Sequence, residues 1–214
     1  MKKLIVSFVS AAALATVGMA AAGGSTAAYD NNSASNNNAA GIFVSGALGY
    51  GYVGYKKSDF FGAPTKLDRS GLAWNANVGY QFNQYVAVEG GYSQFGQGKA
   101  SFPGGETYKT TLRGFGADVK GILPINDQFN VFAKAGAVDM HENTDQSGAT
   151  IGKLTGSAWT PMLGLGTSYN INHNVALTLQ DVYTFRTNFT KSGAKVNIPY
   201  TNDILAGVSY KFNV

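Results

Sequence analysis

The feature that most constrains the fold is an alternation of apolar and polar side chains over residues 70–83, SGLAWNANVGYQFN. Every second residue is apolar or aromatic, a period of two that is typical of a β-strand. The opposite face carries small or polar residues, among them Asn75, Asn77, Gly79 and Gln81. A soluble barrel buries its apolar side chains inward, whereas a barrel in lipid turns them outward and keeps a polar interior. This strand therefore predicts an apolar face toward lipid and a polar face toward a lumen.

The same alternation recurs in seven further segments, residues 41–54, 85–95, 111–123, 129–136, 157–170, 175–186 and 204–214. Their connections alternate in length. The short ones are residues 83–84, 124–128 and 171–174, and the long ones are residues 55–69, 96–110, 141–156 and 187–202. This order is typical of a barrel that crosses a membrane. We predict an all-β fold, an eight-stranded antiparallel up-and-down transmembrane β-barrel, with its long loops outside the cell and both termini in the periplasm.

Composition excludes several classes of function. The chain has no cysteine, which excludes disulfides, thiolate zinc sites, iron–sulfur clusters and a cysteine nucleophile. Only 13% of the residues are charged, about half the usual share. The basic residues are scattered among acidic ones, which argues against nucleic acid as a partner. Beyond Ala40 no stretch of apolar residues is long enough for a transmembrane helix.

The N-terminal part has the pattern of an export signal. Residues 1–22 combine two lysines, an apolar stretch and a run of alanines, which predicts a signal peptide cleaved between Ala20 and Ala28. Residues 23–40 are rich in Asn, Ser and Ala and read as a linker. We therefore expect the barrel to occupy residues 41–214 and to be exported to the cell outer membrane.

Several segments resemble the transmembrane domain of the outer membrane protein A family. They are NVGYQFNQYVAVEGGY at residues 77–92, VKGILPIND at 119–127, NVFAKAGAV at 130–138 and GVSYKF at 207–212. The resemblance implies an outer-membrane barrel without a cofactor, surrounded by lipid and lipopolysaccharide. The last segment resembles the signal read by the barrel-assembly machinery, with Gly207, Tyr210 and Phe212 as its residues.

The chain departs from that family's pattern at two points. A peptidoglycan-binding domain follows the barrel in outer membrane protein A, whereas this chain ends at Val214, so we expect no wall-anchoring role. The family's lumen also holds a Glu that switches between a Lys and an Arg. Glu89 and Lys120 match the Glu and the Lys, but Thr178 stands at the position of the Arg.

Four charged residues fall on the lumen face of three adjacent predicted strands: Glu89, Asp118, Lys120 and Lys134. Their charges sum to zero. An eight-stranded barrel is just wide enough for its side chains to fill, and buried charges are costly unless they are paired. We expect a closed ionic network that fills the lumen. The alternative is a narrow or gated pore.

Histidines are the only candidates for a general base near neutral pH. His141 lies at the base of a long loop, near Ser147, whereas His173 lies in a short turn on the opposite membrane side. Some small outer-membrane barrels modify lipid A with a His and a Ser or Asp, but no spacing here supports that chemistry. A metal site formed by His141, Glu142 and Asp145 is equally weak, so we expect neither a catalytic site nor a metal site.

Three of the four long loops carry net positive charge, when Asp203 is counted with the fourth loop. A positive rim suits lipopolysaccharide phosphates or an acidic partner, such as a host or surface ligand. The sequence thus favours a structural or surface-adhesion protein that is not an enzyme. The alternatives, in order, are a narrow pore, a lipid A-modifying enzyme and a soluble lipocalin-like carrier.

One residue interrupts the pattern. Asp181 falls on the apolar face of its strand, where a charge facing lipid is costly. A β-bulge near Gln180 would turn Asp181 inward. The other possibility is a local interruption of the lipid face, and the sequence leaves both open.

Overall fold

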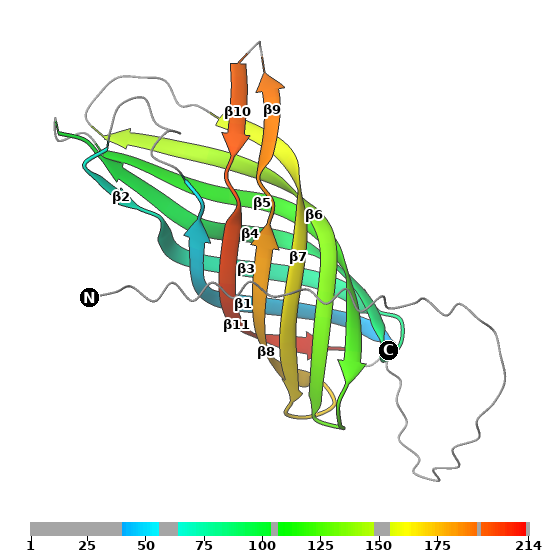
Figure 1. The fold of residues 1–214 in the computed structure, drawn as a ribbon. Helices are drawn as coiled ribbons and strands as arrows, with labels where there is room; N and C mark the ends of the chain where they lie inside the picture. The colour runs from blue at the N-terminus through cyan, green and yellow to red at the C-terminus, as the bar shows by residue number, and fades with distance from the viewer. Residues whose placement is uncertain (1–39, 56–63, 104–106, 148–154, 192–193, 213–214) are drawn as a thin grey trace, which may run out of the picture. The chain divides into compact units, whose positions relative to one another are not determined.

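The computed structural model describes residues 40–55, 64–103, 107–147, 155–191 and 194–212 (Figure 1). It contains eleven strands in these residues: β1 (Gly41–Val53), β2 (Lys66–Asp68), β3 (Ser70–Gln81), β4 (Val86–Ser101), β5 (Thr107–Pro124), β6 (Phe129–Ser147), β7 (Thr155–Asn170), β8 (Val175–Thr184), β9 (Thr187–Lys191), β10 (Ala194–Ile198) and β11 (Thr201–Lys211). The chain divides into two units, residues 1–36 and 37–214, and all described residues belong to the second. The predicted signal peptide and most of the linker lie outside the described residues.

Eight strands close into one barrel. The sheet runs in the order β2-β4-β3-β1-β11-β8-β7-β6-β5, and a further pairing of β4 with β5 joins its ends. All of these pairings are antiparallel. The short strand β2 extends the line of β3 along β4, and β9 and β10 form a separate hairpin between β8 and β11. The predicted eight-stranded antiparallel barrel is confirmed.

The side chains alternate between the two faces as the sequence predicts. Large apolar residues cover the outer wall, with exposed fractions of 63% for Leu48, 57% for Val78 and 64% for Phe115. Their strand neighbours of opposite parity are buried inside, such as Ala47 and Asn75. An apolar outer wall with polar groups inside is the arrangement of a transmembrane barrel. Within the described residues, no helix is long and apolar enough to cross a membrane.

Three tight turns at one end of the barrel are stabilised by the same type of side-chain hydrogen bond. In each, an asparagine side-chain oxygen accepts hydrogen bonds from the backbone amides two and three residues later, at 2.8–3.0 Å. The asparagines are Asn83, Asn126 and Asn172. Such Asx turns satisfy backbone donors that the sheet leaves free. We call this end of the barrel the short-turn end, and the opposite end the hairpin end.

The long connections are more ordered than the sequence predicts. Most of residues 96–110 and 141–156 is paired strand, because β4 reaches Ser101 and β6 reaches Ser147. The extended strands β4, β5 and β6 carry the sheet far toward the hairpin end (Figure 1). Turn and polar residues there suggested loops, whereas continuous backbone pairing across neighbouring strands keeps the segments extended.

Asp181 lies on the outer wall. The register of β8 with β7 and with β11 runs without a break past Gln180, so no bulge turns Asp181 inward. A register irregularity lies instead in β4, between Phe95 and Gln97. Of the two possibilities that the sequence leaves open, the structure shows the local interruption of the lipid face.

Gly207 offers a test of the β1–β11 closure. It faces the lumen, and a Cβ added there would lie 2.3 Å from the backbone oxygen of Gly46 and 2.6 Å from the Cβ of Ala47. We expect Gly207→Val to lower the free energy of unfolding by about 2 kcal/mol, because overpacking forces these backbones apart. Urea unfolding in lipid vesicles measures the change. The neighbouring Ala206→Val, on the exposed outer wall, is the matched control, and an equal loss in both variants would contradict the close approach.

Candidate functional site: the barrel lumen

The four charged residues predicted for the lumen lie together in the structure. Glu89 on β4, Asp118 and Lys120 on β5, and Lys134 on β6 all point inward, and we call them the ionic cluster. Lys120 Nζ lies 2.5 Å from Glu89 Oε2, and Lys134 Nζ lies 3.0 Å from Glu89 Oε1. Lys134 Nζ also lies 3.7 Å from Asp118 Oδ2. Glu89 therefore contacts two ammonium groups at once, one with each carboxylate oxygen.

Aromatic rings enclose the cluster toward the short-turn end. Lys120 Nζ lies 5.3 Å from the centre of the Phe43 ring and 5.0 Å from that of Phe132, within the range of cation–π attraction. Gly166 leaves room for the ring of Phe132, since a Cβ there would lie 2.4 Å from its Cζ. The side chain of Lys120 is 15% exposed, whereas that of Glu89 is 1% exposed. Glu89 is thus the buried centre of the cluster.

Toward the hairpin end the interior is apolar, which differs from the expected polar lumen. A cluster of buried side chains from five strands and one connection fills it, and we call it the apolar plug: Val53, Tyr55, Phe95, Leu112, Val138, Met140 and Ile198. Beyond the ionic cluster the strands continue toward the hairpin end, and the side chains that they turn inward become apolar there. The sequence analysis missed this layer because the predicted strand ended at residue 136, before Val138 and Met140.

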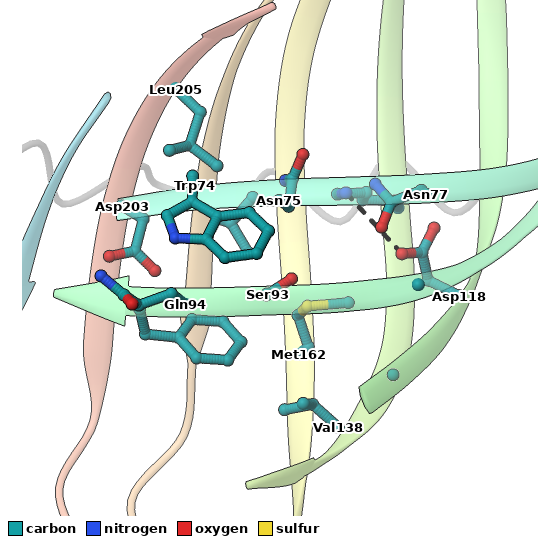
Figure 2. Close-up of a pocket in the computed structure, with 15 residues that line it drawn as sticks. Trp74, Asn75, Asn77, Ser93, Gln94, Asp118, Val138, Met162, Asp203 and Leu205 are labelled. Carbon is teal, nitrogen blue, oxygen red and sulfur yellow. Dashed lines mark ion pairs between the residues drawn. The ribbon is translucent and has the colours of Figure 1, made fainter. Parts of the chain in front are cut away.

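Between these layers lies a small cavity (Figure 2). It has about 20 Å³ of space open to the centre of a water molecule, enough for one or two waters. Asp118 and Asp203 both line it, together with polar side chains such as Asn75 and Gln94. Figure 2 shows the two carboxylates on opposite sides of the view, with Asn75 between them. Asp118 Oδ1 has no hydrogen-bond partner among the described residues.

Asp203 is a lumen charge that sequence reasoning missed. It was counted with the fourth loop, yet it is 1% exposed and belongs to β11. The backbone amide of Gly96 donates to Asp203 Oδ1 over 3.3 Å, and Thr201 Oγ1 donates to Oδ2 over 3.4 Å. Asp203 lies two residues before Leu205, which faces inward, and this spacing was the sequence feature that could have placed Asp203 in the lumen. In the described part of the chain no cation forms a salt bridge with it.

The remaining candidate groups do not converge on one site. His141 is exposed on the outer wall, with Nε2 3.9 Å from Asp139 Oδ2, while Glu142 accepts a hydrogen bond from the Tyr55 hydroxyl on the inner side. His173 is exposed in a short turn at the other end of the barrel. The side chains of Asp145 and Ser147 lie outside the described ones. Among the described residues no group of three His, Asp or Glu is placed to hold a metal ion.

Thr178 stands at the position where the resembled family has an Arg. Thr178 faces the lumen on β8, where it pairs with Gly207 and Ser168 in the sheet. It carries no charge, so Glu89 has no alternative cation on this strand. Lys134 on β6 provides the second ammonium instead, and it does so together with Lys120.

The terminal residues of the predicted assembly motif face outward. Tyr210 and Phe212 are 43% and 45% exposed, and their rings pack edge to face with centres 4.9 Å apart. Phe212 follows β11, and its backbone amide donates to the carbonyl oxygen of Ile42 on β1. The motif thus lies at the short-turn end of the strand that closes the barrel.

Comparisons with known proteins agree with this architecture. The structure of Neisserial surface protein A matches with a TM-score of 0.58 at 16% identity, over 80% of this chain and 97% of that one. OprG of Pseudomonas aeruginosa matches with a TM-score of 0.52 at 17% identity, over 82% and 97%. Ail, the attachment invasion locus protein of Yersinia pestis, in complex with the heparin analogue sucrose octasulfate, matches with a TM-score of 0.51 at 17% identity, over 80% and 99%.

At these identities the solved structures show a shared fold alone. No curated protein sequence matches this chain significantly. The family model described as the OmpA-like transmembrane domain matches residues 15–214, which is most of the chain. The chain therefore belongs to the OmpA-like transmembrane domain family, and it is an outer-membrane β-barrel.

Proposed function

We propose that this barrel is a surface-exposed structural and adhesion protein whose lumen does not conduct ions. The observation that carries the proposal is the filled interior, in which the ionic cluster and the apolar plug follow one another along the barrel axis. A barrel of eight strands has no space for a channel beside such side chains. Export through a signal peptide over residues 1–22 is part of the same proposal.

The adhesive surface that we propose is the outer wall of the extended strands at the hairpin end. Lys99 on β4 and Lys109 on β5 are both exposed and lie directly opposite each other in the register. Like charges in such a pair are destabilising, so an anionic partner would relieve their repulsion. On β2, Lys66 lies opposite Ser101 and the exposed Asp68 lies opposite Lys99, so one carboxylate also faces this pair. Because Ail, a barrel of the same fold, was solved with a heparin analogue, we propose a sulfated or phosphorylated surface polysaccharide as the partner.

An enzymatic role is not part of the proposal. Lipid A modification would need a histidine beside an activated nucleophile. His141 contacts Asp139 on the outer wall, and His173 lies at the opposite end of the barrel. A narrow pore is the second candidate, favoured by the small cavity that Asp118 and Asp203 line.

Removal of Glu89 tests the closed lumen. Glu89→Ala leaves Lys134 with Asp118 and removes the ion pair of Lys120, and we expect the free energy of unfolding to fall by about 3 kcal/mol. Asp127→Asn, in an exposed turn, should have no such effect. In planar-bilayer recordings the unchanged protein should show little conductance, while Glu89→Ala shows brief openings. A large, stable and ion-selective current through the unchanged protein would favour the pore instead.

The lysine pair tests the adhesive surface. We expect Lys99→Gln/Lys109→Gln to bind immobilised heparin about tenfold more weakly at low salt, since two surface charge contacts are lost. Lys99→Arg/Lys109→Arg keeps the charges and should bind as before. Binding of the unchanged protein should also weaken as salt is added. Equal heparin affinity of the glutamine and arginine variants would remove this surface from the proposal.

The terminal motif of Gly207, Tyr210 and Phe212 is proposed as the signal for the barrel-assembly machinery. Phe212→Asp should abolish surface display, measured by labelling of intact cells. Phe82→Asp is the matched control, because Phe82 is also exposed at the short-turn end and packs edge to face on Tyr80 with centres 5.1 Å apart. Both changes place a charge at the membrane interface, at a cost of about 1 kcal/mol. Equal display of the two variants would mean that the motif is not read.

A further inference from the structure

Asp181 is an acidic residue that the register places among lipid-facing side chains, as it places Asp139 between Phe115 and Trp159. Its neighbours in the register are Leu165 on β7 and Ile204 on β11, which are 50% and 58% exposed. Asn202 Nδ2 donates a hydrogen bond to Asp181 Oδ1 over 2.5 Å. A charged group at such a position is costly and calls for a functional explanation. A hydrogen-bond donor that approaches Asp181 from the lipid side would lower this cost.

Aromatic residues continue from this pair toward the hairpin end. Asn202 is paired in the sheet with Tyr52 on β1 and Tyr183 on β8. The ring of Tyr200 stacks on Tyr183, with centres 5.7 Å apart, and lies 6.2 Å from that of Tyr52. A Cβ at Gly54 would lie 2.1 Å from Tyr200 Cε1, so this glycine gives the Tyr200 ring its place against the wall. Three tyrosines thus form one platform above the Asp181–Asn202 pair.

A cation lies at the outer edge of this platform. Arg69 Nη1 donates to the Tyr52 hydroxyl over 3.2 Å, and the backbone of Arg69 lies opposite Val53 at the hairpin end of β1. Tyr200 lies in the link between β10 and β11. Burial, with the neighbouring hydroxyls of Tyr52 and Tyr183, raises the pKa of the Tyr200 hydroxyl, while Arg69 acts in the opposite direction. The guanidinium and the tyrosine hydroxyls therefore gather in one place.

We propose that this strip of the outer wall binds one molecule of a phosphorylated amino-sugar glycolipid with amide-linked acyl chains, the chemistry of lipid A. The strip consists of Asp181, Asn202, Tyr52, Tyr183, Tyr200 and Arg69. Asp181 and Asn202 accept hydrogen bonds from the amide and hydroxyl groups at the top of the acyl chains. The tyrosine rings pack against the sugar, and Arg69 binds a phosphate. The inference rests on the proposed function for its orientation, with the hairpin end outside the cell.

The order of these groups along the barrel matches the order of groups in such a lipid. From the membrane interior outward, β11 presents Ile204, then Asn202 and then the link residue Tyr200. A glycolipid presents acyl chains, then amides and hydroxyls, then sugar and phosphate. Aromatic residues are enriched at the interface of a membrane barrel, which places the tyrosine platform at the level of the headgroup.

A second copy of the chain fits this strip less well. Two barrels in one membrane share the same orientation, so a two-fold contact through the strip would bring like groups to the same depth. At the depth of Asp181 the partner would present its own Asp181 and apolar residues such as Leu165 and Ile204, which do not pair with a carboxylate. Such a contact leaves the charge of Asp181 uncompensated in a medium of low dielectric constant. A lipid that has hydrogen-bond donors nearer the membrane interior and a phosphate nearer the surface pairs the donors with Asp181 and the phosphate with Arg69.

Titration of the refolded full chain with lipid A tests the proposal, with native mass spectrometry counting bound lipid in detergent micelles. We expect one tightly bound molecule. Asp181→Leu and Arg69→Gln should each weaken binding about tenfold, the size expected for loss of a hydrogen bond to a charged group. The matched controls are Asp139→Leu and Arg113→Gln, which change outward-facing residues on β6 and β5 and should stay within about twofold of the unchanged protein. Asp181→Leu should also raise the urea midpoint in phosphatidylcholine vesicles, which proves that this variant folds.

Three outcomes would overturn the inference. One is equal binding of phosphatidylglycerol, which has phosphate but no amide, without an effect of Asp181→Leu. Another is unchanged lipid A binding in both strip variants. The third is a dimer that forms without lipid and is lost in Asp181→Leu. A barrel that stays closed and binds heparin but takes up no lipid A would refute this inference and leave the proposed function standing.

Discussion

The pairing of backbone groups around a closed sheet is the constraint on which this structure depends. In hydrocarbon no water can satisfy an unpaired amide or carbonyl, so a sheet that spans a membrane must have no free edge. Here β4–β5 pairing joins the ends of a sheet whose β1–β11 pairing already unites the first and last strands of the barrel. Because the side-chain period is two, closure also fixes which residues face lipid and which face inward.

Closure at eight strands determines what the interior can hold. The lumen is so narrow that side chains from facing strands must interdigitate, and glycines supply the space at the closest approaches. Gly164 illustrates this, since a Cβ there would lie 2.7 Å from Cγ of Lys134. Lysine can therefore reach Glu89 and Asp118 from β6 only because its neighbour on β7 has no side chain. The ionic cluster is a consequence of packing as well as of charge.

The sequence predicted the strands, their parity and the members of the ionic cluster, because each of these depends on local alternation. Glu89 and Lys134 lie where their parity placed them. It did not predict the apolar plug or the extended parts of β4, β5 and β6. There the segments contain Gly, Thr, Asn and charged residues that are common in loops, and pairing with neighbouring strands decides their conformation. Contacts such as Lys120 between Phe43 and Phe132 depend on which strands meet across the lumen, which alternation alone does not specify.

The register of β8 with β11 also fixes the faces on which two aspartates lie. Asp181 and Asp203 lie on adjacent strands, where Asp203 pairs with Val182, so one carboxylate faces lipid and the other faces the lumen. A slip of one residue would reverse both faces of a strand and bury its apolar residues among polar groups, so the register cannot adjust to hide either charge. Neither aspartate has a cation within salt-bridge distance in the described part of the chain. Local rules of stability are most often broken at functional sites. The two carboxylates, which have hydrogen bonds but no salt bridge among the described residues, therefore mark the wall and the cavity beside these strands, rather than the well-paired ionic cluster, as candidates for a functional site.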